Sequence, residues 1–142
     1  MSLDILFIHP NASKKIYQGL SNEHSAIEPP IWAGMLANHC KNKNHDVKIL
    51  DCEVEKLDYI SSAKKIKEFK PRIACFVVYG QQPSASSQNM EGAVATSEEL
   101  KRLDPEIKVL FVGGHVSALP RETLLTEKSI DIIALNEGVY SI

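Results

Sequence analysis

The chain has 142 residues, 44% of them hydrophobic, with a formal net charge of −2 and a pI near 6.2. This size and composition fit one compact domain with a real core, and the charge balance excludes the basic surface that nucleic-acid binding requires. No apolar run approaches the ~20 residues that span a bilayer, and no basic leader precedes a long apolar run. We therefore expect a cytoplasmic protein with no nucleic-acid and no membrane partner.

The first half of the chain predicts two strands and two helices. Residues 4–8 are an apolar run that ends at His9 and Pro10, which predicts a buried strand. The polar segment 11–28 lacks periodicity, and Pro29 and Pro30 then suit a helix start. Five residues recur at helical spacing and are expected to face a sheet: Trp32, Met35, Leu36, His39 and Cys40. Residues 46–51 alternate as an edge strand does, and a second amphipathic helix follows over 60–69.

The second half continues the alternation. Residues 73–79 form the longest apolar run, typical of a central parallel strand, and a polar loop over 80–87 separates it from a helix over about 89–103. Further strands are expected at 108–112 and 130–135, with a short helix at 120–125 between them. This order predicts an α/β fold, a three-layer flavodoxin-like (Rossmann-like) domain with a five-stranded parallel sheet of order 2-1-3-4-5.

No linker or repeat divides residues 1–142, so we expect a single domain. After the fifth strand the chain stops at residues 139–142, where a further element should begin, and residues 1–3 resemble an added leader. The chain is therefore expected to be a piece of a longer protein. Its cysteines, Cys40, Cys52 and Cys75, are too widely spaced for a disulfide framework or a metal motif, and Cys75 is expected to be buried in its strand.

A glycine pair is the most informative local feature. Gly113 and Gly114 follow an apolar strand and precede a helix start, and ligands of parallel sheets bind at the carboxyl ends of the strands. Without side chains, the backbone there is open to a bulky ligand. The alternative is that the pair only makes a tight turn.

Four segments, in order, are similar to the cobalamin-binding domain that precedes radical S-adenosylmethionine enzymes. They are the proline-pair helix start at 29–37, the second strand at 44–51, the glycine pair at 113–120 and the turn after the fifth strand at 136–138. The turn departs from the family pattern, because Asn136 stands where a glycine is usual and Val139 where a second acid is usual. The Asp-x-His-x-x-Gly motif that supplies a cobalt ligand in other cobalamin proteins is absent, as is a Cys-x-x-x-Cys-x-x-Cys cluster motif.

The resemblance implies that the domain binds cobalamin base-off at the carboxyl edge of the sheet. It implies a downstream radical S-adenosylmethionine barrel in the same polypeptide, with S-adenosylmethionine and a 4Fe-4S cluster as further cofactors and methyl transfer as the reaction. Because this chain contains no cluster motif and no nucleophile–base pair at that edge, we expect no turnover from it alone and assign it no catalytic residue.

The expected cofactor-binding residues come from the four strand ends. The hydroxyls of Ser84, Ser86 and Ser87 are further candidates for bonds to phosphate or amide groups. His9 lies where a cobalt ligand would be, but a hydrogen bond to the loop or the ligand is preferred, so no protein metal ligand is assigned. The cofactor-binding set is His9, Pro10, Asn11, Tyr79, Gly80, Gln81, Ser84, Gly113, Gly114, His115, Ser117, Asn136, Glu137 and Gly138.

Other classes of protein share this topology. A receiver domain needs acids after the first strand and an aspartate after the third, where this chain has His9 and Tyr79, so that class is excluded. A flavin carrier needs a Ser/Thr-rich phosphate loop after the first strand, and residues 11–13 are a poor version of one. A nucleotide-sugar or small-metabolite binding domain and a non-catalytic interaction module stay open as alternatives.

Overall fold

The computed structural model describes residues 3–11, 29–80 and 83–142, and for residues 83–85 it describes the backbone alone. Ten elements follow in chain order: β1 (Ile5–His9), α3 (Ile31–Asn42), β2 (Val47–Asp51), α4 (Tyr59–Phe69), β3 (Ile73–Val78), α5 (Pro83–Leu103), β4 (Lys108–Gly113), α6 (Gly114–Ala118), α7 (Pro120–Thr126) and β5 (Ile132–Ala134). The strands form one parallel sheet of order β2-β1-β3-β4-β5. The predicted fold class and strand order are confirmed.

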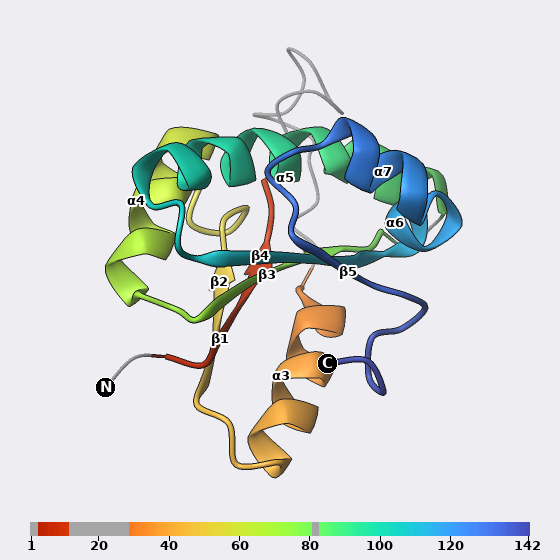
Figure 1. Ribbon diagram of the computed structural model, residues 1–142. Coiled ribbons are helices and arrows are strands. Elements are labelled where there is room, and N and C mark those ends of the chain that lie inside the picture. The colour runs from red at the N-terminus through yellow and green to blue at the C-terminus, as the bar shows by residue number, and fades with distance from the viewer. Residues whose placement is uncertain (1–2, 12–28, 81–82) are drawn as a thin grey trace.

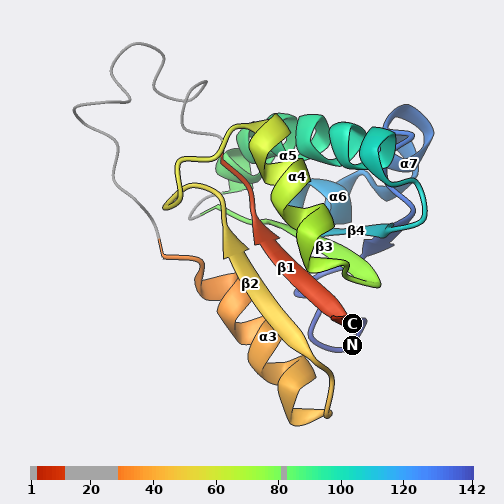
Figure 2. The same cartoon turned by 90° about the vertical axis from the view of Figure 1, so that its left-hand side faces the viewer.

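Helices cover both faces of the sheet, but unequally. Of the helices in the described residues, Figures 1 and 2 show only α3 on one face and α4, α5, α6 and α7 on the other. Each strand supplies both cores, since successive side chains point to opposite faces. In β1, Leu6 and Ile8 join the core under α4 and α5, whereas Ile5 and Phe7 join the core under α3. This two-sided burial explains why the central strands are apolar without alternation.

The prediction for the buried face of α3 was partly wrong. Leu36 and Cys40 are buried as expected, but the rest of the buried face is Ala33 and Ala37. Trp32 is 36% exposed and Met35 51% exposed. Small alanines let the helix approach the sheet closely, so the two bulky residues lie on its flank.

The helix after β3 begins earlier than predicted. We expected a loop through residue 87, but α5 starts at Pro83, a residue that suits the first turn of a helix. Ser86 and Ser87 therefore lie on a helix. A separate helix, α6, follows β4 directly, and the strand ends differ from prediction by one or two residues.

Two further expectations concern the cysteines and membrane-spanning helices. Cys40, Cys52 and Cys75 are free and buried, as predicted for Cys75. None of the helices in the described ranges is long and apolar enough to cross a bilayer.

Candidate functional site at the carboxyl edge of the sheet

The carboxyl ends of β1, β3, β4 and β5 lie at one edge of the sheet, because these strands are parallel and adjacent. His9, Val78 and Gly113 are the last residues of their strands, and Val78 pairs directly with Gly113. The predicted site residues after these strands are thus brought to one edge where the structure describes them. Gln81 and the side chain of Ser84 lie outside the described residues.

Ser86, on α5, forms hydrogen bonds with the end of β3 and with the first turn of α6. Its hydroxyl donates a hydrogen bond to the Val78 carbonyl at 2.6 Å and accepts one from the His115 N–H at 3.0 Å. The residue is buried. The hydroxyl proton and one acceptor position are therefore used within the protein, and the expected role of Ser86 in ligand binding stays a prediction.

A second set of bonds connects the end of β3 with the turn after β5 and with α6. The Tyr79 hydroxyl donates to the Asn136 carbonyl, and the Asn136 N–H donates to the Ser117 Oγ at 2.9 Å. The Asn89 side-chain amide donates to the Tyr79 carbonyl at 3.2 Å. Asn136 has a φ of 58°, a left-handed conformation that asparagine tolerates better than most residues. The network therefore holds the turn after β5 against the end of β3, while Glu137 stays exposed.

Tyr79 is also part of an aromatic pair. Its ring stacks on Trp32 with a centroid separation of 4.5 Å and an interplanar angle of 22°. Burial, followed by the nearby charge of Glu137, raises the pKa of Tyr79 to about 12. The phenol is therefore neutral and remains a hydrogen-bond donor at physiological pH.

A cavity of about 280 Å³ lies between the start of α3 and the ends of β1 and β3. Its walls are largely apolar and include the aromatic pair; they are formed by His9, Pro29, Pro30, Ile31, Trp32, Ala33, Met35, Val77, Tyr79 and Gly80. Sequence analysis placed only His9, Tyr79 and Gly80 in the site. For the lining residues at the start of α3, the proline pair was the sequence signal, because it sets where this helix begins beside the strand ends.

His9, at the end of β1, and Asn11, just after it, contact the segment between β2 and α4. The His9 Nε2 lies 3.3 Å from a carboxylate oxygen of Glu53. The Asn11 side-chain amide donates to the Leu57 carbonyl at 3.0 Å, and Pro10 is buried. Within the described part of the chain, no three His, Cys, Asp or Glu side chains are grouped as a metal site would require.

Three of the four glycines of the predicted site, Gly113, Gly114 and Gly138, differ in what a side chain would meet. A Cβ at Gly113 would lie 2.1 Å from the Val78 carbonyl oxygen, so close strand pairing alone requires this glycine. Gly138 has a φ of 75° and a Cβ there would lie 2.8 Å from Val112, so it too is required by packing. Gly114 is exposed, and a Cβ there would meet only Ser86, at 3.6 Å. Among these three, Gly114 is the one that offers bare backbone to a ligand.

An edge with an apolar, aromatic-walled cavity at the ends of β1 and β3, and exposed backbone at Gly114 just past the end of β4, is typical of α/β domains that hold a large organic cofactor. The chain belongs to the B12 binding domain family, whose sequence profile matches residues 19–141. Cobalamin is the cofactor of this family, and the predicted family membership is confirmed.

The chain is also similar to individual proteins and solved structures. Over 110 residues the chain is 30% identical to an uncharacterized methyltransferase of Pyrococcus horikoshii, an alignment that covers 78% of this chain and 22% of the relative. Two structures of the radical S-adenosylmethionine methyltransferase TsrM from Kitasatospora setae share the fold, with TM-scores of 0.58 and 0.57 at 17% and 18% identity. They match 84% of this chain and 21% and 20% of TsrM. The first contains a tryptophan substrate and an S-adenosylmethionine analogue, the second cobalamin and a 4Fe-4S cluster. The chain thus spans about a fifth of the length of these relatives.

Proposed function

We propose that this domain binds cobalamin base-off at the carboxyl edge of its sheet. The observation that supports this most is the combination of the family match with an apolar cavity and, at the same edge of the sheet, the exposed backbone of Gly114. The nucleotide tail ends in a flat, largely apolar base. A cavity walled by Trp32, Tyr79 and Met35 is chemically suited to such a base, because aromatic rings prefer stacked or edge-on aromatic partners.

Each of the residues at this edge has a separate role in cofactor binding. Gly114 lets the cofactor approach the backbone without steric conflict. The Ser86 and Tyr79 bonds hold the loops around it in one arrangement. His9 stays paired with Glu53 and does not ligate cobalt. When bound, cobalamin supplies a cobalt centre that can receive and pass on a methyl group.

We further propose that the domain presents cobalamin to a radical S-adenosylmethionine domain that uses S-adenosylmethionine and a 4Fe-4S cluster, for methyl transfer. The methyltransferase relatives, of which this chain spans about a fifth, support the proposal. The reading frame that encodes this chain is expected to continue past Ile142 and to encode three clustered cysteines. A stop codon directly after Ile142 would contradict the arrangement in one polypeptide.

A titration with hydroxocobalamin, followed by visible absorbance, tests binding by the domain. We expect a saturable spectral change with wild-type protein, and none would count against the site. Reduction to the Co(II) form, followed by electron paramagnetic resonance, tests the axial ligand: no nitrogen splitting is expected in wild type or in His9→Ala. Nitrogen splitting in wild type that disappears in His9→Ala would make His9 the cobalt ligand and overturn that part of the proposal.

A further inference from the structure

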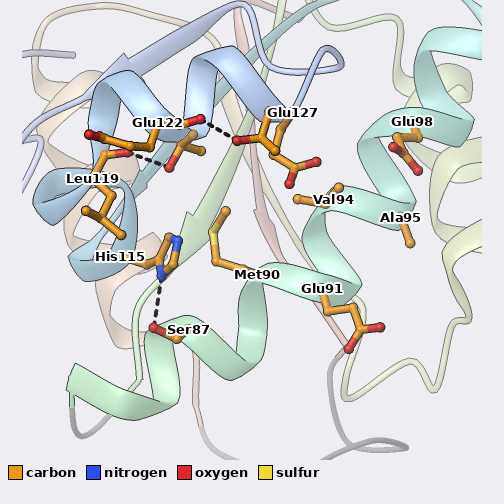
Figure 3. A pocket seen from close by; sticks show the side chains of 12 residues that line it. Ser87, Met90, Glu91, Val94, Ala95, Glu98, His115, Leu119, Glu122 and Glu127 are labelled. Atoms are coloured by element: carbon orange, nitrogen blue, oxygen red, sulfur yellow. Dashed lines mark hydrogen bonds between the residues drawn. The ribbon is translucent and has the colours of Figure 1, made fainter.

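A second hollow lies on the opposite side of the sheet from α3, between α5 and the pair α6 and α7. It has a volume of about 580 Å³. Figure 3 shows α5 as one wall and α6 and α7 as the other, with Met90 and Val94 between them. The cofactor proposal assigns it no role. We call it the α5–α7 groove; its lining is Ser87, Met90, Glu91, Val94, Ala95, Glu98, His115, Leu119, Glu122, Thr123, Thr126 and Glu127.

The lining residues follow helical periodicity on both walls. On α5 they run from Ser87 to Glu98 at steps of three and four, which places them on one face over about 16 Å of helix. The second wall shows the same steps from Leu119 to Glu127. Two roughly helical ridges with a gap between them make an elongated groove, the shape into which a third helix packs.

The floor of the groove is apolar and continuous with the core. Met90 is buried in the core under α4 and α5, and Val94 packs against the same core. Leu119 borders the groove and is 45% exposed. Covering its side chain would lower the free energy, because apolar surface would be removed from water. A partner that covers this floor must therefore offer an apolar stripe.

The rims of the groove are acidic. Four glutamates line it, two from each wall, and the lining includes neither lysine nor arginine. Glu98 and Glu122 are exposed on opposite walls. The nearest basic side chains of α5 are already paired, Lys101 with Asp131 and Arg102 with Glu99. An acidic rim repels nucleic acid and anionic lipid and attracts lysine and arginine.

We propose that the α5–α7 groove is the docking site for a basic amphipathic helix of a partner protein. The helix would place an apolar stripe at i, i+3, i+4 and i+7 on Met90, Val94 and Leu119, and flanking lysines or arginines against the glutamates. A second copy of this chain is a poorer occupant. Its basic helix, α4, already packs on α5 of its own molecule, and a contact of α4 with the groove of another copy would be head-to-tail rather than the two-fold contact of the commonest dimers.

The test is a binding titration with a fluorescently labelled peptide of about four helical turns, built from leucine and lysine with the leucines in one stripe. Two control peptides have the same stripe with glutamate in place of lysine, and the same composition with the stripe scrambled. We expect saturable binding of the striped basic peptide, and salt should weaken it. Both control peptides should bind with an affinity at least about tenfold lower.

Charge-reversed proteins show where the peptide binds. The double variant Glu98→Lys, Glu122→Lys should weaken binding about tenfold or more, because it turns two attractions into repulsions. Glu68→Lys, a single charge reversal on the exposed side of α4 and away from the groove, should leave affinity unchanged. Circular dichroism spectra and thermal midpoints close to wild type confirm that the variants fold. Equal binding of the scrambled peptide, or of the double variant, would overturn the proposal. So would concentration-dependent self-association of wild type that the double variant abolishes.

Discussion

The Tyr79 hydroxyl donates a hydrogen bond to the backbone carbonyl of Asn136, 57 positions further along the chain. The ring of the same tyrosine stacks on Trp32 at the start of α3. One side chain therefore joins the end of β3, the turn after β5 and the wall of the cavity. Because the Asn136 turn is left-handed and also tied to Ser117, this contact connects local backbone geometry to the proposed cofactor site.

Replacing Tyr79 with phenylalanine should remove this hydrogen bond while keeping the aromatic stack. We expect the free energy of unfolding to fall by about 1 kcal/mol, the usual net contribution of one hydrogen bond. Hydroxocobalamin affinity should fall modestly, because the turn after β5 loses one of its fixed contacts. Urea denaturation and the visible titration measure the two effects. Unchanged stability would show that the hydroxyl does not hold the turn.

The same tyrosine predicts a pH dependence of stability. Burial, with a smaller effect of Glu137, raises the pKa of Tyr79 from 10.0 to about 12. The folded protein therefore keeps a phenol proton that the unfolded chain releases. The resulting stabilisation is fully present below pH 10 and is lost as the pH rises from 10 to about 12. Urea midpoints across this range should converge for wild type and Tyr79→Phe. A constant difference between them would contradict the raised pKa.

The two adjacent glycines should respond differently to alanine. Gly113→Ala places a methyl group against the Val78 carbonyl oxygen, and we expect a loss of about 2 kcal/mol or more, because backbone cannot yield as a side chain can. Gly114→Ala meets Ser86 at ordinary contact distance, so its effect on stability should stay within about 0.5 kcal/mol. Thermal or urea unfolding of the matched pair measures both. Similar losses in the two variants would show that β3 and β4 can separate at this end.

The three cysteines should be inert in the folded protein. All are buried, and burial raises the pKa of the Cys52 thiol to about 11 and raises those of Cys40 and Cys75 as well. Because thiol reagents attack accessible thiolates, labelling by Ellman's reagent should be about a hundredfold slower in native protein than in guanidinium. Rapid labelling of one thiol in native conditions would place that cysteine in a region that opens locally.

The fold could be predicted from the sequence because its signals are local and repeated. Apolar runs such as 73–78 and the proline pair before α3 mark buried strands and a helix start wherever they occur. The buried face of α3 was harder to predict, since hydrophobicity ranks Trp32 above Ala33, whereas close packing on a sheet favours the alanine. The start of α5 was missed because small polar residues such as Ser86 suit a loop unless a tertiary bond occupies their hydroxyls.

The candidate site was predictable in position and less so in membership. Parallel strand ends must share an edge, so His9, Tyr79 and Gly114 could be grouped without a structure. Trp32 could not, because its place in the cavity depends on how α3 packs. Nor does the sequence show which glycine of the pair is required by packing. Gly113 is required because a side chain there would clash with the carbonyl of Val78, which lies 35 positions earlier on the neighbouring strand.

The most direct test of the proposed function is the hydroxocobalamin titration repeated on Gly114→Leu. A Cβ at this exposed position meets only Ser86, at ordinary contact distance, so we expect the variant to fold like wild type by circular dichroism and thermal unfolding. Glu68→Leu, which adds an exposed leucine to α4, is the matched control. We predict that wild type and Glu68→Leu give the same saturable spectral change and that Gly114→Leu gives none. Equal binding by Gly114→Leu and wild type would contradict the placement of cobalamin at the carboxyl edge of the sheet.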